Sequence, residues 1–338
     1  MAIYYQWSLG TPKYFDRAYD LKINTYKNDC QKFDFLADKQ RELCSLNRNI
    51  LQTVANGARL GIDECQHQFH MNRWNCTTYD EPQLRVFGGV LDIYSREKAF
   101  IHAITSAGVA YTMTRACSKG EISDCGCDVK VRHKDTNGKW EWGGCSDDVH
   151  YGSQFSKNFI DTIEASDSPQ GLMNLHNNEA GRRAIRSNME LICKCHGVSG
   201  SCTVRVCWRK LKQFREVGNQ LVRRFDGSTH VKPMDRKNQS RLRPTRKDIK
   251  RPSKKDLVYL EESPDFCFKN MSAGVLGTKG RVCNATSYGM DGCRLLCCGR
   301  GYQTVEKEVE EKCDCKFVWC CKVQCKVCKK QREHHFCN

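Results

Sequence analysis

Residues 193–202 read CKCHGVSGSC, a short loop in which three cysteines bracket a histidine, two glycines and two serines. Such a loop could bind zinc through sulfur and imidazole ligands, or activate a serine as a nucleophile. It could also present a hydroxyl for modification or for contact with a partner. Glycines near Ser199 remove steric cover and tolerate unusual backbone dihedral angles. The rest of the chain must decide among these chemistries.

The zinc and serine-nucleophile alternatives each lack part of their usual pattern. Cys195 and His196, with Cys202 and Cys207 nearby, do not form the paired C-x2-C layouts typical of structural zinc sites. A nucleophile elbow reads G-x-S-x-G, but position 201 is Ser rather than Gly. We therefore predict no metal site and no catalytic residue, and we favour a presentation loop.

Cysteine usage indicates the class of the protein. The 338-residue chain has 24 cysteines, twelve within 1–207 and twelve within 267–338. This density is typical of a disulfide scaffold formed in an oxidising compartment, so we expect a secreted, extracellular protein. No stretch approaches the ~18 apolar residues that span a membrane. The first twenty residues lack a signal-peptide pattern, which indicates a mature or partial chain.

Positive charge is concentrated in one strip. The formal net charge is +16, and residues 232–255 hold eleven Lys or Arg against two Asp. The strip is either a solvated linker or a site for anions. In a secreted protein the expected anion is a sulfated glycosaminoglycan such as heparan sulfate, or a lipid head group, rather than nucleic acid. A secreted heparin-binding matrix protein is therefore the alternative function.

Two kinds of secondary structure must position the loop. Apolar residues that recur at spacings of three and four predict amphipathic helices over much of the first part of the chain. These helices are expected over 35–62, 99–116, 155–163, 172–192 and 208–225. After the basic strip the pattern changes, and residues 315–325 alternate as a strand does.

Nested cysteines predict two rigid hairpins, which we call the first and second fingers. In an antiparallel hairpin, cross-strand partners have nearly constant sums of residue numbers, although spacing alone does not fix connectivity. The first finger spans 193–207 and the second 313–328, and a rigid finger loses little entropy on binding. The sums favour five pairs: Cys193–Cys207, Cys195–Cys202, Cys313–Cys328, Cys315–Cys325 and Cys320–Cys321.

The predicted fold is α+β and disulfide-rich, with an N-terminal helical bundle that carries a β-hairpin finger and then a small cysteine-rich β domain. Residues 1–231 form the helical domain with the first finger, and 232–256 form a basic linker. Residues 257–338 form the cysteine-rich C-terminal domain with the second finger. Because this domain has little apolar core, we expect it to depend on its disulfides.

Long motifs resemble the Wnt family of secreted, lipid-modified signalling glycoproteins. They include CKCHGVSGSC itself, ARLGIDECQHQFHMNRWNCTT (58–78), WGGCSDDVHYG (142–152), LMNLHNNEAGRRAI (172–185), DGCRLLCCGRGY (291–302) and CKFVWCCKVQCKVC (315–328). The resemblance covers roughly residues 30–338. FDGSTHVKP (225–233) and MSAGVLGTKGR (271–281) look most like the fourth Wnt subfamily. The resemblance implies a two-finger Wnt fold and a morphogen ligand rather than an enzyme.

The resemblance also implies partners and contact residues. Ser199 is similar to the family's serine that carries a palmitoleate ester, added by the acyltransferase Porcupine, after which the carrier Wntless takes the protein to the surface. The fingers would grip the Frizzled cysteine-rich domain, an LRP-type co-receptor would complete the signalling complex, and membrane association would come only through the acyl chain. The implied receptor contacts are His196, Gly197, Val198, Ser199, Gly200, Phe317, Trp319, Cys320, Cys321 and Val323.

Further covalent features complete the expectations, and no cofactor is expected beyond palmitoleate and N-linked glycans. The N-x-S/T pattern occurs at four asparagines. Asn75 and Asn284 lie in blocks that resemble the family's glycosylation sites, whereas Asn238 lies in the basic strip and Asn270 lies near Cys267. The resemblance implies seven further disulfides: Cys30–Cys44, Cys65–Cys76, Cys117–Cys125, Cys127–Cys145, Cys267–Cys298, Cys283–Cys293 and Cys297–Cys337.

Overall fold

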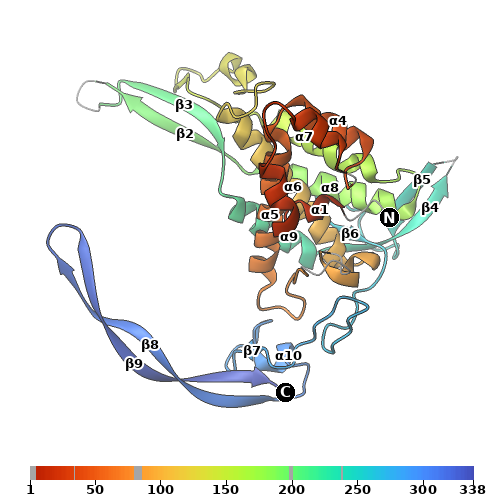
Figure 1. Cartoon of the computed structure of the whole chain (residues 1–338), viewed down its shortest axis with the longest axis vertical. Coiled ribbons are helices and arrows are strands. Elements are labelled where there is room, and N and C mark those ends of the chain that lie inside the picture. Colours follow the sequence, from red (N-terminus) through yellow and green to blue (C-terminus); the bar gives the residue numbers. More distant parts are fainter. Residues whose placement is uncertain (1–4, 34, 80–85, 198–200, 237–238) are drawn as a thin grey trace. The chain divides into compact units, whose positions relative to one another are not determined.

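The chain forms two compact units, which Figure 1 shows as a largely helical part and a largely β part. The first unit comprises Met1–Gln68 and Cys76–Pro264, and the second comprises Phe69–Asn75 and Asp265–Asn338. The computed structural model describes residues 5–33, 35–79, 86–197, 201–236 and 239–338.

Helix α6 (Arg96–Ser118) is the centre of the first unit. It is buried on almost all sides and packs against α7 (Val149–Ile160), α8 (Pro169–Ser187) and α9 (Phe214–Asp226). No helix in the described part of the chain is long and apolar enough to cross a membrane. The remaining helices are α1 (Tyr5–Ser8), α2 (Pro12–Tyr19), α3 (Tyr26–Gln31), α4 (Asp38–Leu46), α5 (Asn49–Phe69), α10 (Cys293–Leu296) and the 3-10 turns η2 (Gly88–Asp92), η3 (Val129–His133) and η4 (Asp161–Ile163).

Glycines let α5 and α6 approach closely. A Cβ atom built on Gly108 would lie 2.2 Å from the carbonyl oxygen of Gly57, closer than real carbon–oxygen contacts allow. Small residues therefore bring the two helices together, and larger apolar side chains fill the space around them. This core includes Leu51, Val54 and Phe159, all at most 1% exposed.

Across the residues that the structure describes, the strands form three small sheets. Their orders are β1-β3-β2, β5-β4-β6 and β7-β9-β8. The first two sheets belong to the first unit and the third to the second unit. The strands are β1 (Glu141–Trp142), β2 (Met189–His196), β3 (Val204–Leu211), β4 (Thr229–Arg236), β5 (Gln239–Pro244), β6 (Val258–Tyr259), β7 (Val282–Cys283), β8 (Tyr302–Val318) and β9 (Lys322–Cys337).

Three predicted helices are partly wrong. The single helix expected over 35–62 is two helices, α4 and α5, because the backbone is extended at Asn47 between them. The helix expected over 172–192 ends at Ser187, and the one expected over 208–225 begins only at Phe214. The apolar residues between them pair across β2 and β3, as Ile192 does with Trp208. A spacing of three or four residues can continue from a helix into a strand, so cross-strand pairing overrides the helical pattern here.

The basic segment 232–256 also differs from the linker predicted for it. Strand β4 pairs antiparallel with β5 and parallel with β6, so this segment is built into a sheet of the first unit. At its end, Asp256 Oδ1 pairs with Arg224 Nη1 at 2.6 Å. Because the backbone supplies the sheet hydrogen bonds, a run of basic side chains does not prevent strand formation.

The unit boundary lies at Pro264 and Asp265 rather than at 256 and 257, and Phe69–Asn75 belongs to the second unit.

The guanidinium of Arg281 binds the backbone of this short segment, Phe69–Asn75. Arg281 Nη1 donates to the carbonyl oxygens of Asn72 at 2.7 Å and Arg73 at 2.9 Å. Contacts between residues some two hundred positions apart cannot be predicted from the spacing of residues in the sequence.

Candidate functional site: two disulfide-pinned fingers

Eleven disulfides join cysteines in the structure, and each is one of the twelve pairs expected from the sequence. In the first finger, Cys193 is bonded to Cys207 and Cys195 to Cys202. These sulfurs are therefore not thiolates that could bind zinc. The zinc alternative for CKCHGVSGSC is wrong.

The twelfth expected pair, Cys320–Cys321, is not formed, because both residues are exposed free cysteines. Adjacent Cα atoms across a trans peptide lie about 3.8 Å apart, below the ~4.4–6.8 Å that disulfides usually span. Both residues also have positive φ angles, 72° and 77°, in the turn between β8 and β9. The tip of the second finger thus presents two neighbouring thiols.

Strands β2 and β3 form the first finger, which extends from the helices in Figure 1. Their register is constant from Met189 opposite Leu211 to His196 opposite Val204. Cys193 therefore faces Cys207 directly, as the residue-number sums predicted, and the two are bonded. The hairpin is confirmed, and its second disulfide lies nearer the tip.

The described part of the first finger's tip is small and polar. His196 and Gly197 are exposed, and Thr203 Oγ1 donates to the carbonyl oxygen of His196 at 3.2 Å. A Cβ on Gly197 would lie 2.4 Å from the carbonyl oxygen of Ser201, so only glycine allows this close approach. The remaining expected contacts, Val198, Ser199 and Gly200, lie outside the described residues.

Strands β8 and β9 form the second finger, a long twisted hairpin in Figure 1 that extends beyond the predicted 313–328, from Tyr302 to Cys337. It is bonded by Cys315–Cys325 and Cys313–Cys328. The register shifts between Cys313 and Lys316, where an irregularity interrupts the ladder. Two disulfides thus hold a two-stranded hairpin that alone would be marginally stable in water.

The tip of the second finger exposes large apolar side chains. Phe317 is 68% exposed, Trp319 92% and Val323 61%. Phe317 pairs directly with Val323, so the two side chains share one face of the hairpin. Clustered apolar side chains that face water indicate a binding surface. The structure thus brings these predicted contact residues to one end of the finger.

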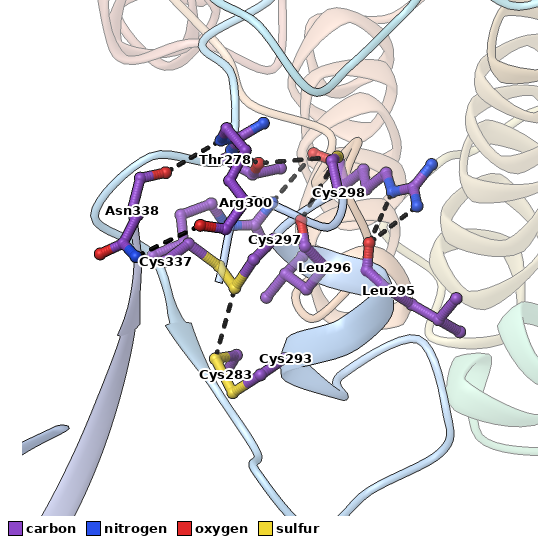
Figure 2. The surroundings of a disulfide bond; sticks show 12 residues. Thr278, Cys283, Cys293, Leu295, Leu296, Cys297, Cys298, Arg300, Cys337 and Asn338 are labelled. Carbon is purple, nitrogen blue, oxygen red and sulfur yellow. Dashed lines mark hydrogen bonds between the residues drawn. A yellow bond between two sulfur atoms is a disulfide. The ribbon is translucent and has the colours of Figure 1, made fainter. Parts of the chain in front are cut away.

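The base of the second finger is built from sulfur. Figure 2 shows the Cys297–Cys337 disulfide beside Cys283–Cys293, with Cys297 Sγ 3.5 Å from Cys283 Sγ. The sulfurs of Cys283, Cys297 and Cys337 lie close enough together to share a metal ion. Each is already bonded in a disulfide, so none is a thiolate that could bind one. The buried core of this part is these four cysteines and Leu296. Disulfides therefore replace most of the apolar packing at the root of this finger.

Two glycosylation motifs adopt the same local geometry. Asn284 Oδ1 accepts a hydrogen bond from Thr286 Oγ1 at 2.9 Å, and Asn270 Oδ1 accepts one from Ser272 Oγ at 2.7 Å. Both asparagines are exposed, whereas Asn75 is half-buried. The fourth, at position 238, is Asn238 and lies outside the described residues. Glycosylation of all four stays a prediction.

The helical unit that carries the first finger contains a buried pair of titratable groups. His102 is fully buried, and its Nδ1 lies 3.2 Å from Asn178 Oδ1 and 3.9 Å from Glu164 Oε1. Burial lowers the pKa of His102 to about 3 and raises the pKa of Glu164 to about 7. Desolvation disfavours the charged form of each group, so Glu164 changes its protonation near neutral pH while His102 stays uncharged there.

Sequence reasoning missed the residues that hold the first finger at its root. Ser146 and Asp147 are 6% and 3% exposed and bond to β3. Their only signal in the sequence is the motif WGGCSDDVHYG, which supports a family resemblance but does not reveal a contact with a strand some sixty residues away.

The helical unit, the small disulfide-rich β unit and the two fingers define a class of extracellular, disulfide-dependent two-finger proteins. The wnt family model matches residues 32–338. Human Wnt-2b is 49% identical over 91% of this chain and 79% of its own length, and mouse Wnt-5a is 43% identical over 98% and 88%. A solved structure described as human WLS in complex with WNT8A matches with a TM-score of 0.62 and 40% identity, covering 86% of this chain and 94% of its own.

The chain belongs to the Wnt family. Proteins of this family are secreted signalling ligands and not enzymes, so the serine-nucleophile alternative for the first finger is set aside. Wnt-2b and Wnt-5a are relatives of this chain, and the likeness to the fourth subfamily stays a prediction.

Proposed function

We propose that this chain is a secreted Wnt-type morphogen ligand that binds the cysteine-rich domain of a Frizzled receptor with both fingers. The observation that carries the proposal is the apolar tip of the second finger, where Trp319 is 92% exposed on a disulfide-bonded hairpin. Exposed aromatic side chains on a rigid support are typical of binding hot spots. Family membership supports the choice of receptor.

The first finger would act through a lipid. Its described residues beyond the His196–Val204 pair are small or polar, so the tip itself offers little apolar area. A palmitoleate ester on Ser199, added by Porcupine, would supply about 10 kcal/mol of gross transfer free energy at roughly 0.8 kcal/mol for each buried CH2. The two hairpin disulfides would hold the acylated tip in place.

Ser199→Ala tests this division of labour. We expect loss of acylation, of secretion and of Frizzled binding together, since one lipid would serve the carrier and the receptor. Ser201→Ala is the matched control, because it removes a hydroxyl two residues away and should leave all three intact. Unchanged affinity of the Ser199→Ala protein for the Frizzled domain would overturn the proposal.

A Wntless carrier and an LRP-type co-receptor are the further proposed partners. The match to the structure of human WLS in complex with WNT8A supports the carrier, and family membership supports the co-receptor. Co-purification of the acylated chain with Wntless from detergent, together with its loss for Ser199→Ala, is the expected result. Equal recovery of both proteins would argue against a lipid-dependent carrier.

The basic segment supports a proposed contact with heparan sulfate. After β5, exposed basic side chains follow one another closely, and Arg246 is paired with Asp248 at 2.7 Å. The exposed set is Lys247, Lys250, Arg251, Lys254 and Lys255. Replacing these five by Ser should lower the salt concentration that elutes the protein from heparin, while Frizzled binding stays unchanged. If heparin elution does not change, the sulfated chain binds elsewhere.

We also propose N-linked glycans on the exposed motifs at Asn270 and Asn284. In both, the hydroxyl of the third residue already bonds the asparagine oxygen. Treatment with a peptide N-glycanase should increase gel mobility, and Asn270→Gln and Asn284→Gln should each remove one step. An unshifted wild-type band would contradict glycosylation at every motif.

A further inference from the structure

A short segment follows the outer edge of β3 in the first finger. Residues 141–147, which we call the brace, include β1, which pairs in parallel with β3 on the side opposite β2. Beyond β1 the contacts continue: Gly143 N donates to the carbonyl oxygen of Cys207 at 3.1 Å, and Asp147 N donates to that of Arg209 at 2.9 Å. With the brace, the base of the two-stranded hairpin becomes a three-stranded sheet.

The sequence of the brace suits this close approach. A Cβ on Gly143 would lie 2.3 Å from Val206 Cγ1, so any larger residue would force the Val206 side chain or the brace to move. Gly144 has a φ of 61°, and a Cβ there would lie 3.2 Å from the Trp208 ring. The two glycines in WGGCSD are therefore explained by contact with the finger.

Two side chains of the brace continue the bonding where the backbone of β1 ends. Ser146 Oγ accepts a hydrogen bond from Arg209 N at 3.1 Å, and Asp147 Oδ2 accepts one from Leu211 N at 2.8 Å. These are the last β3 residues before the chain leads into α9. Side-chain oxygens thus bind the backbone of β3 at the point where the finger leaves the helices.

The same carboxylate joins the finger to α6. Ser118 Oγ donates to Asp147 Oδ1 at 2.5 Å, and Arg115 Nη1 lies 3.4 Å from Asp147 Oδ2. Both partners belong to the last turn of the central helix. Because Asp147 is 3% exposed, these charge-assisted bonds form away from water, where they are strong and where an unpaired charge is costly.

Apart from the brace, the finger is attached to the helices by its two chain ends, where β2 follows α8 and β3 leads into α9. Strand β2 starts one residue after α8, and Asn188 at this junction donates from Nδ2 to the carbonyl oxygen of Ala184 at 2.8 Å. A hairpin held at two neighbouring points can pivot about the line that joins them. The brace and Asp147 add a third attachment, to a different helix, off that line.

We propose that Asp147 is a positioning residue that fixes the direction in which the first finger leaves the helical unit. This inference rests on the proposed function, because direction matters only if the tip must enter a receptor. A finger already held in its binding orientation loses less freedom on association. Removing the Asp147 carboxylate would leave the finger folded, with both disulfides and the backbone pairing of the brace, but without its bonds to α6, so that the finger could pivot more widely.

Asp147→Asn tests the proposal in the full-length, acylated protein. We expect amide hydrogen exchange at Leu211, whose N–H donates to the Asp147 carboxylate, to accelerate at least tenfold while α5 and α7 exchange as in the wild type. The association rate with the Frizzled cysteine-rich domain should fall about tenfold, with a nearly unchanged dissociation rate. A merely structural role would speed exchange throughout the helices and would not separate the two rates.

Control variants keep the test decisive. Asp148→Asn removes the neighbouring carboxylate, which caps α7 through the backbone amides of His150 and Tyr151, and should change neither the exchange nor the rates. If Asp147→Asn does not fold, Ser118→Ala decides, since it removes one bond to the carboxylate and should slow association about threefold. The proposal is overturned if Asp147→Asn and Ser118→Ala, or whichever of them folds, show wild-type hydrogen exchange and wild-type association. If the wild-type protein does not bind Frizzled, the proposed function is rejected. The hydrogen-exchange result then still tests whether Asp147 holds the finger.

Discussion

The first finger is attached to a unit whose core is made of aliphatic and aromatic side chains, whereas the second finger is attached to one whose core is mostly disulfide sulfur. Phe159 and Leu51 are fully buried in the first core, and Cys297 and Cys337 dominate the second. The tips differ in the opposite sense. The described tip of the first finger is polar, and that of the second exposes Phe317 and Trp319.

This contrast teaches how a small unit can support an apolar tip. A unit of about 80 residues buries too little surface for a stable core, so disulfides supply the missing stability. Its apolar side chains then remain available for a partner instead of being drawn inward. The larger helical unit has apolar residues enough for a core, and its finger would obtain apolar surface from an attached lipid.

Removal of the disulfide at the root of the second finger should have the largest effect. Cys297→Ser with Cys337→Ser breaks the bond that joins α10's end to the end of β9, and we expect a loss of about 2–5 kcal/mol in the free energy of unfolding of the second unit. Limited proteolysis should cut residues 265–338 while the helical unit resists. Equal resistance of both units to proteolysis would contradict the claim that the second unit depends on its disulfides more than the first does.

Trp319→Ala should separate binding from stability. Because this side chain is 92% exposed, its removal should leave thermal unfolding unchanged. We expect Frizzled affinity to fall about thirtyfold or more, which is about 2 kcal/mol or more, as for aromatic hot spots. Val327→Ala is the control, since Val327 is 64% exposed on the same hairpin but away from the tip. Equal losses for both would mean that the tip has no special role.

Gly108→Ala should show that the first unit depends on packing. Its new methyl group would collide with the carbonyl oxygen of Gly57, so we expect a cost of about 1–3 kcal/mol in unfolding of the helical unit, with every disulfide intact. Gly227→Ala is the matched control, because a Cβ there would meet nothing closer than 3.7 Å. Calorimetry that shows the same transition for both variants would contradict this account.

The smallest expected effect is a pH dependence of the first unit. The pKa of Glu164 is raised from 4.5 to about 7, so the folded state binds a proton that the unfolded state does not, and stability should increase as pH falls from 8 to 6.5, by about 1 kcal/mol. The pKa of His102 is lowered from 6.5 to about 3, so its contribution is lost as pH falls below 6.5.

Denaturant unfolding of the helical unit at pH 8, 7.2 and 6.5 checks this dependence. Glu164→Gln should remove the rise between pH 8 and 6.5, since its side chain carries no titrating proton. Below pH 6.5 the opposing terms of His102 and Glu164 should flatten the wild-type curve. A curve for Glu164→Gln that matches the wild type would show that another group titrates.

The two fingers could be predicted from the sequence because residue numbers encode a hairpin's register. Cys193 and Cys207 face each other as their sum required. The same logic identified Cys313–Cys328, although the register places Lys326 rather than Cys328 opposite Cys313. Paired cysteines tolerate such a shift, because a disulfide can also join diagonal neighbours.

Other features could not be predicted because they depend on contacts between distant residues. Nothing local marks Asp147 as the partner of Ser118 and Leu211. Nor does anything local mark Arg281 as the donor to the carbonyl oxygens of His70, Asn72 and Arg73. The free pair Cys320 and Cys321 was mispredicted because nested sums ignore the short reach between neighbours.

The central claim is that the fingers reach one receptor by different means, with a lipid on the first and side chains on the second. The most direct test is the mass of the tryptic peptide 195–205, which contains both Ser199 and Ser201, from secreted protein that binds Frizzled. The account predicts a palmitoleoyl adduct that fragmentation assigns to Ser199, with Ser201 unmodified. An unmodified peptide from protein that still binds Frizzled would contradict it.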